Sequence, residues 1–169
     1  MWAKSSILAN MRQHCSRRKF VAGVVAASGS SAIAQSSVQK TGAVRGFDHV
    51  ALPMQNTQAM VAFYRGLGFD VVENANACSV YIGEQMINFH LPARWQNAEF
   101  TLRAPAAKPP CGDLCFVWDG TPDTLKAMLD KAGAKIIEGP VARQGGRKKG
   151  ASSVYVRDPD GNLLEFMIY

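Results

Sequence analysis

Two histidines, together with one glutamate near the end of the chain, are the residues best suited to bind a metal or to catalyse a reaction. His49, His90 and Glu165 each lie in a short segment rich in β-branched and aromatic residues. Two imidazoles and one carboxylate suit a divalent Fe, Mn, Zn, Ni or Co ion, with coordination positions left open for substrate or water. The sequence therefore predicts a metal site with His49, His90 and Glu165 as ligands, if the fold brings them together.

Two other roles for these residues stay open at this point. A single histidine in a strand is often hydrogen-bonded and structural, and a glutamate near the end of a strand often faces solvent. Glu165, however, follows two leucines and precedes Phe166 and Met167, so it interrupts an apolar run. A carboxylate buried in such a run needs a cation or hydrogen-bond donors.

A duplicated pattern of elements supplies a reason for the three residues to converge. The order strand, helix, three strands is predicted once over residues 46–92 and again over residues 111–169, separated by a connector rich in proline. We expect strands at residues 47–53, 69–73, 78–82, 86–91, 113–118, 134–138, 152–156 and 163–168. Neither half alone has enough residues for a good core, so the two halves are expected to pack together.

The expected helices begin at polar residues and end at glycines. Thr57 is the predicted cap of the first, and Gly66 and Gly68 its stop. Thr121 or Asp123 is the predicted cap of the second, which ends near Gly133.

The letters of the two halves give an alignment of the candidate ligands. Residues 77–82 match residues 151–156, and Asp48 matches Asp113. On this alignment Leu114 stands at the place of His49, and Glu165 at the place of His90, so three of four equivalent positions hold metal-ligating side chains. Two sheets facing each other would aim these positions at one cavity.

Residues 1–34 are predicted to be an export signal. A basic region runs to Lys19, an apolar stretch follows, and residues 32–34 (Ala-Ile-Ala) fit a signal-peptidase site. Residues 16–21 (Ser-Arg-Arg-Lys-Phe-Val) resemble the twin-arginine motif, which favours a periplasmic or secreted protein without stable membrane anchoring after cleavage. A general secretory signal and an organelle transit peptide are the alternatives. Residues 35–45 are predicted to be a polar linker.

The net charge of +6 is concentrated at the N-terminus. Residues 1–34 contain five lysines and arginines, and the rest of the chain has 14 basic and 13 acidic side chains. The body is nearly neutral, so electrostatics gives no reason to expect a nucleic-acid partner.

The motifs of the body resemble those of the vicinal oxygen chelate superfamily, which includes glyoxalases, extradiol dioxygenases and bleomycin-resistance proteins. The resemblance covers residues 46–169 and rests on Phe47-Asp-His-Val-Ala-Leu52, Ala62-Phe-Tyr-Arg-Gly-Leu-Gly-Phe69, Ala132-Gly-Ala134, Glu138-Gly-Pro140 and Tyr155-Val-Arg-Asp-Pro-Asp-Gly-Asn-Leu-Leu-Glu165. It implies an α+β fold of two tandem βαβββ modules whose mixed sheets curl around a metal cup.

The resemblance also implies a function. It assigns His49, His90 and Glu165 as ligands of a divalent metal, with Glu165 able to serve as a catalytic base, while Leu114 departs from a histidine common in the family. The implied activity is that of a metal-dependent lyase or dioxygenase acting on a small oxygenated molecule. The alternative is a metal-free protein that binds and sequesters a drug or metabolite. A homodimer is expected, with the cup built either within one chain or across two.

Three further side chains are candidates for substrate binding. Tyr81 and Tyr155 occupy matching places in the two halves, where core packing is the alternative role. Arg143 opens a basic loop, residues 143–150, that either closes over an anionic substrate or is simply solvated. Cys78 and Cys115 lie in apolar patterns and are expected to be buried thiols, and a Cys111–Cys115 disulfide is left open.

Overall fold

The structure is a computed structural model that describes residues 42–169. The predicted export signal and most of the predicted linker lie outside the described residues. Residues 42–45 are exposed and have no regular secondary structure. All helices and strands that follow belong to one unit, Ala43–Tyr169, and none of its helices has the length and apolarity needed to cross a membrane.

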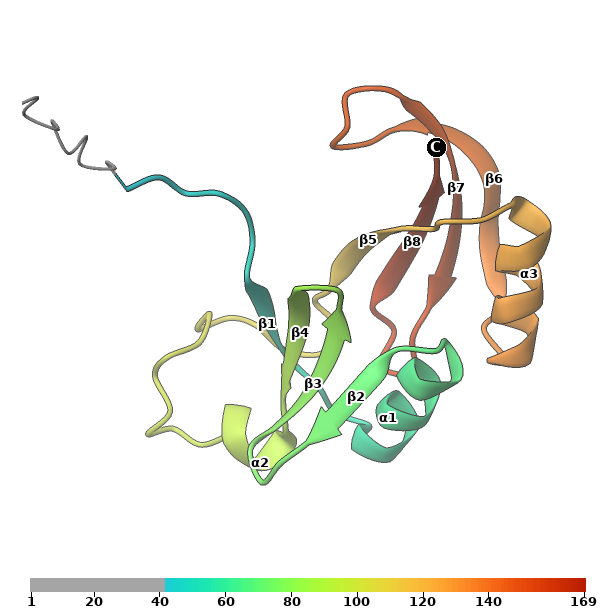
Figure 1. Ribbon diagram of the computed structural model, residues 1–169. Helices are drawn as coiled ribbons and strands as arrows, with labels where there is room; N and C mark the ends of the chain where they lie inside the picture. The colour runs from blue at the N-terminus through green and yellow to red at the C-terminus, as the bar shows by residue number, and fades with distance from the viewer. Residues whose placement is uncertain (1–41) are drawn as a thin grey trace, which may run out of the picture. The chain divides into compact units, whose positions relative to one another are not determined.

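The first half of this unit is a four-stranded sheet with one covering helix (Figure 1). Its strand order is β1-β4-β3-β2, with β1 parallel to β4 and the other pairs antiparallel. The elements are β1 (His49–Pro53), α1 (Thr57–Gly66), β2 (Asp70–Glu73), β3 (Ala77–Ile82) and β4 (Gln85–His90).

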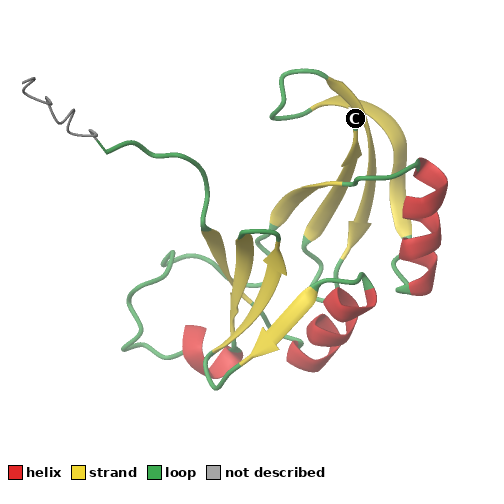
Figure 2. Cartoon of the chain, viewed as in Figure 1, coloured by secondary structure: helices red, strands yellow, loops and turns green. Residues whose placement is uncertain are grey.

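The second half repeats this topology with the order β5-β8-β7-β6. The elements are β5 (Asp113–Val117), α3 (Pro122–Lys131), β6 (Ile136–Gln144), β7 (Gly150–Arg157) and β8 (Leu163–Ile168). Two four-stranded mixed sheets with few helices confirm the α+β class and the tandem βαβββ modules (Figure 2). A short helix that the sequence did not predict, α2 (Pro92–Trp95), begins the connector between the modules.

The helix caps differ in detail from the expectation. Thr121 caps α3 as predicted, since its side chain accepts a hydrogen bond from the backbone N–H of Thr124 in a capping box. Helix α1 is capped one residue earlier than predicted, at Asn56, whose own side chain makes no capping hydrogen bond. Another residue must therefore satisfy the free N–H groups at the start of α1.

One shared core lies between the sheets and the two long helices. Met60 and Tyr64 of α1, Leu125 and Leu129 of α3, and residues from both sheets form a single buried cluster. Phe69 and Phe116 join the modules directly, with ring centroids 5.4 Å apart. The core therefore uses one face of each sheet and leaves the other face free to carry polar groups.

The free face of each sheet carries three rows of side chains that run across neighbouring strands. In the first module the rows are His49–Met86–Tyr81, Ala51–Asn88–Ser79 and Pro53–His90–Ala77. In the second module they are Asp113–Leu163–Arg157, Cys115–Glu165–Tyr155 and Val117–Met167–Ser153. Residues paired in register point to the same face of a sheet, so each row is a set of spatial neighbours.

Hydrogen bonds at both ends of the parallel pairs fix which rows are equivalent. The N–H of Met86 donates to Asp48 O (3.1 Å), as the N–H of Leu163 does to Gly112 O (3.0 Å). At the other end, Met54 N–H donates to His90 O (3.0 Å) and Trp118 N–H to Met167 O (2.9 Å).

These bonds make Asp113 the equivalent of His49, and Asn88 the equivalent of Glu165. The alignment based on sequence letters, which made Leu114 the equivalent of His49 and Glu165 the equivalent of His90, is wrong. Leu114 packs against the core cluster, so its side chain leaves the sheet on the other face.

Candidate functional site

The imidazole of His49 is held by its sequence neighbour. Its Nδ1 lies 2.6 Å from Asp48 Oδ1, and its side chain is about half exposed. A carboxylate that accepts a hydrogen bond from Nδ1 makes this nitrogen the donor and leaves the lone pair of Nε2 available. Histidines that bind metals are commonly oriented in this way. His49 therefore has the chemistry of a ligand that is oriented in advance.

Glu165 lies in the middle row of the second sheet with one oxygen unused. Its Oε1 is buried and has no hydrogen-bond partner among the described residues. An ionised carboxylate in that condition needs a cation or a hydrogen-bond donor, and the Tyr155 hydroxyl and the Cys115 thiol are the donors that lie beside it. This orphaned oxygen is an observation of the structure that fits the predicted metal.

Cys115 lies beside Glu165 in the same row and is exposed, so the prediction of a buried thiol is wrong for this residue. Partial burial and the neighbouring Glu165 carboxylate together raise the pKa of Cys115 to about 11. The thiol is therefore protonated at neutral pH. Cys78 is buried as expected, and Cys111 is a free thiol, so no Cys111–Cys115 disulfide is present.

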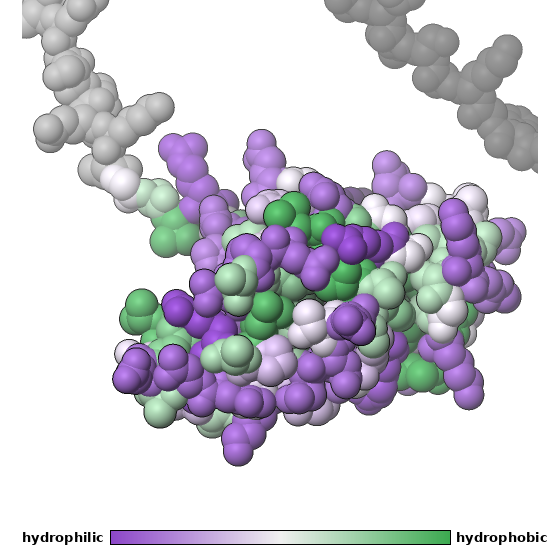
Figure 3. All heavy atoms as spheres, turned by 90° about the horizontal axis from the view of Figure 1, so that it is seen from below, coloured by the Kyte–Doolittle hydropathy of each residue, from purple (hydrophilic) through white to green (hydrophobic). Residues whose placement is uncertain are grey.

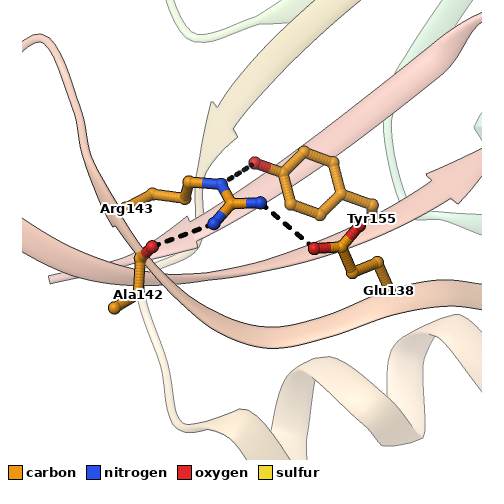
Figure 4. Close-up of polar contacts among 4 residues, drawn as sticks. All are labelled: Glu138, Ala142, Arg143 and Tyr155. Carbon is orange, nitrogen blue, oxygen red and sulfur yellow. Dashed lines mark hydrogen bonds and ion pairs between the residues drawn. The ribbon is translucent and has the colours of Figure 1, made fainter.

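Arg143 and Tyr155 form one wall of a cavity of about 420 Å³ that Glu165 also lines. The Arg143 guanidinium donates from Nε to the Tyr155 hydroxyl (3.0 Å), from Nη2 to Glu138 (3.1 Å) and from Nη1 to Ala142 O (3.1 Å), as Figure 4 shows. Arg143 is thus placed at the candidate site by internal bonds. Tyr81, exposed on β3, lines neither this cavity nor the groove described next.

A second and larger hollow, of about 560 Å³, lies between the edge strands β1 and β5. His49 and Asp113 line it, together with Val50 and Val117 of the two strands and Phe47, which precedes β1. Asp113 lines this groove and the cavity of Glu165 alike, so it stands between the two predicted ligands.

His90 lies apart from the other two predicted ligands. It is paired with Pro53, and His49 begins the same strand four residues earlier, which corresponds to about 13 Å along the sheet. Burial lowers the pKa of His90, and the positive charge of Arg94 lowers it further. Within residues 42–169, no three His, Cys, Asp or Glu side chains lie close enough to share one metal ion.

The basic loop after Arg143 is fastened to the end of the chain. The Arg147 guanidinium lies 4.7 Å and the Lys149 ammonium 5.2 Å from the centre of the Tyr169 ring, in cation–π geometry. The backbone N–H of Arg147 also donates to the Tyr169 hydroxyl (3.5 Å). The loop thus covers the end of β8, and its cations gather beside the row of Met167.

Comparison with known proteins identifies the class. The sequence model of the Glyoxalase/Bleomycin resistance protein/Dioxygenase superfamily matches residues 46–166. The chain is 36% identical over 124 residues to virulence protein STM3117 of Salmonella typhimurium, covering 72% of this chain and 83% of that protein. It is 33% identical over 136 residues to the glyoxalase domain-containing protein RDO1 of Mycosarcoma maydis, covering 80% and 74%.

Solved structures agree with these sequence matches. The crystal structure of the Salmonella protein superimposes with a TM-score of 0.67 at 33% identity, covering 76% of this chain and 99% of that one. A lactoylglutathione lyase from Agrobacterium tumefaciens shares the fold, with a TM-score of 0.55, 22% identity, and coverage of 73% and 92%. This protein belongs to the Glyoxalase/Bleomycin resistance protein/Dioxygenase superfamily.

Asp113 is the site residue that sequence reasoning missed. Its equivalence to His49 depends on strand register, which the letter match misplaced by one residue. The alternation of β5, in which Leu114 and Phe116 are apolar and Asp113 and Cys115 are not, is the signal that would have placed Asp113 on the polar face.

Proposed function

We propose that the protein is a metal-dependent lyase or dioxygenase of this superfamily that acts on a small oxygenated molecule. The proposed ligands of the divalent ion are His49, Asp113 and Glu165. The observation that carries the proposal is the buried, unpartnered Oε1 of Glu165. Imidazole and carboxylate donors suit Mn, Fe, Zn, Ni and Co, which is the range predicted above.

When bound, such a metal supplies Lewis-acid polarisation of two neighbouring oxygens of a chelating substrate. The chain's own residues do the rest. Asp48 orients His49, and Glu165 can accept a proton from a carbon beside a polarised oxygen. The Tyr155 hydroxyl, held by Arg143 at 3.0 Å, can hydrogen-bond an oxygen of the substrate in the same cavity.

We further propose that two copies of the chain complete each cup. Strands β1 and β5 are edge strands, and the apolar groove between them exposes Val50 and Val117, which are 38% and 50% accessible. Unpaired edges beside exposed apolar residues favour association. A homodimer that joins the first sheet of one copy to the second sheet of the other would bring His49 towards Glu165 of the other copy.

Metal content of purified protein tests the proposed chemistry. We expect one divalent ion per chain in the wild type and loss of that ion in Glu165→Gln. The matched control, Glu73→Gln, removes a glutamate of an exposed pair with Arg65 and keeps the ion. Turnover of small diols and ketoaldehydes should follow the metal content. Equal metal content in all three proteins would overturn the assignment of Glu165.

Mixing two inactive variants tests whether the site spans two copies. Chains carrying His49→Ala and chains carrying Glu165→Gln are unfolded together and refolded. If each site spans two copies, mixed dimers hold one intact site, and about a quarter of all sites recover metal. If each site lies within one chain, no site recovers.

A second candidate function is metal-free binding of a small molecule, and the groove of about 560 Å³ between β1 and β5 favours it. Ligand pockets are concave and mostly apolar with few polar groups, as this groove is. A ligand that binds wild type and Glu165→Gln equally, in the presence of chelator, would support this candidate.

We also propose that the protein is exported by the twin-arginine pathway. The proposal is supported by residues 16–21. Replacing Arg17 and Arg18 by lysines should retain the protein in the cytoplasm of its host, whereas unchanged export would point to the general secretory route.

A further inference from the structure

The connector that follows β4 closes a small cavity beside His90, and its lining residues differ from those of the groove and of the cavity of Glu165. We propose that His90 and Arg103 form a subsite for a carboxylate group of the protein's ligand. The subsite stands on its own geometry and rests on the proposed function only for the claim that the same ligand reaches the metal.

Arg103 presents one edge of its guanidinium without a partner. Its Nη1 donates to Ala104 O (3.2 Å) and Pro105 O (3.0 Å), and these bonds fix the group against its own loop. Its Nε is buried and has no hydrogen-bond partner among the described residues. The edge formed by Nε and Nη2 is the one that binds a carboxylate side-on with two parallel hydrogen bonds.

The cavity that Arg103 lines has room for a small group such as a carboxylate. Its volume is about 40 Å³, against the roughly 10–15 Å³ that one water needs. Its walls are Ala51, Pro53, His90, Trp95, Arg103, Ala104 and Ala107. Trp95 is fixed in this wall because its indole N–H donates to Met54 O (2.8 Å).

The charges around the cavity favour an anion over a cation. None of the lining residues is acidic. The Arg94 guanidinium lies 3.8 Å from the centre of the Phe100 ring, and the same ring lies edge-on to His90 at 5.1 Å. Glu99, the nearest acidic residue along the loop, is exposed and lines a separate hollow. A divalent metal at His90 would face two guanidinium groups, whereas an anion would be attracted by both.

The rows of the first sheet connect this subsite to the proposed metal centre. Ala51 and Pro53 line the cavity, and His49 lies on the same face of β1. A ligand with chelating oxygens near His49 and a carboxylate about 13 Å further along β1 would span both places. The substrate class that this arrangement selects is an oxygenated carboxylic acid with an extended carbon chain.

Binding of formate to the full-length protein treated with chelator tests the subsite without involving the metal. We expect saturable changes in the nuclear magnetic resonance signals of the His90 ring and of the amides of Ala104 and Ala107. Arg103→Met should weaken formate binding at least tenfold. Lys126→Met, which removes one charge from an exposed pair on α3, should leave it unchanged.

A second variant keeps the test valid if Arg103→Met does not fold. Ala107→Leu fills the cavity from the loop without changing a charge, and it should also abolish the response to formate. No saturable response in the wild type, or formate binding by both cavity variants that is as tight as that of the wild type, would overturn the proposal. Phosphate that binds as tightly as formate would overturn the assignment to carboxylates. Because chelator is present, none of these outcomes bears on the metal site.

Discussion

Asp160, in the turn before β8, caps helix α1 of the other module through Asn56. Its carboxylate accepts hydrogen bonds from the backbone N–H of Asn56 (2.8 Å), from the Asn56 side-chain amide (2.8 Å) and from the backbone N–H of Gln55 (2.6 Å). Asn56 makes no capping bond of its own, and the acid 104 residues away accepts the N–H of this N-cap residue and places negative charge at the start of α1. The turn that introduces Glu165 is thereby tied to the first module.

Replacing Asp160 by alanine should weaken the association of the modules. We expect the free energy of unfolding to fall by about 1–2 kcal/mol, since the loss of a charged capping residue has that range. Urea unfolding followed by circular dichroism measures the change. Asp130→Ala, which removes only an exposed pair with Lys126, should cost less than about 0.5 kcal/mol. Equal losses of stability in the two variants would show that the bonds of Asp160 to Gln55 and Asn56 stabilise the protein no more than an exposed ion pair does.

Asp158 in the same turn predicts a dependence of stability on pH. It is buried and accepts hydrogen bonds from Tyr64 OH (3.1 Å) and from Asn162 Nδ2 (2.8 Å). Burial raises the pKa of Asp158 although these bonds oppose the shift. The folded state therefore binds this proton more tightly than the unfolded state does, so the contribution is complete below the unfolded pKa and is lost as the pH rises through the folded pKa.

Asp158→Asn isolates this contribution. Wild type should be more stable than the variant by about 1–3 kcal/mol at pH 7, because the new amide group opposes the amide donor of Asn162. This advantage should be larger at pH 4 and should decline as the pH rises. Urea titrations at pH 4, 5, 6 and 7 measure it, and Asp130→Asn is the control. An advantage that grows with pH would contradict the raised pKa.

The sequence predicted the elements well and the relation between the modules less well. Strands β1, β3, β4 and β8 agree with expectation to within about two residues, because alternation of apolar side chains marks each of them. Strand β6 was predicted to end at Glu138 and continues to Gln144. Its extension, residues 139–144, is mostly exposed and begins with a glycine and a proline, so hydrophobic patterning carries no signal for it.

The candidate site was predicted in part for a related reason. The polar face of each sheet could be predicted by alternation, but the equivalence of Asp113 to His49 depends on backbone hydrogen bonds. The subsite around His90 depends on Arg103, which lies in a connector without regular secondary structure. Such a segment has no periodicity that would place its side chains.

The close packing around Gly145 gives a test of how firmly the basic loop is held. A Cβ at this position would collide with the Tyr169 hydroxyl and the Met167 sulfur, whereas a Cβ at Gly146 would meet open space. Gly145→Ala should therefore displace the ends of the Tyr169 and Met167 side chains and release the loop at a cost of no more than about 1 kcal/mol, while Gly146→Ala should be nearly neutral. Limited trypsin digestion should cleave after Arg147 faster in the first variant only. Equal cleavage rates would show that the contact with Tyr169 does not hold the loop.

We expect Glu165→Gln to change stability in opposite directions with and without metal. Its buried Oε1 has no hydrogen-bond partner among residues 42–169, so the metal-free chain carries the cost of burying an unpaired polar atom. Glu165→Gln should raise the free energy of unfolding by about 1 kcal/mol in the presence of chelator, because it removes the carboxylate charge and keeps the shape. At a metal concentration 100 times the Kd, the free energy of unfolding of the wild type should rise by about 2.7 kcal/mol, and that of the variant should rise little.

Thermal unfolding of both proteins, with chelator and with each candidate metal, measures the two effects. The control Glu73→Gln should behave like the wild type. A variant that is less stable than the wild type by the same amount in both conditions would make Glu165 a packing residue, since only a ligand responds to the metal.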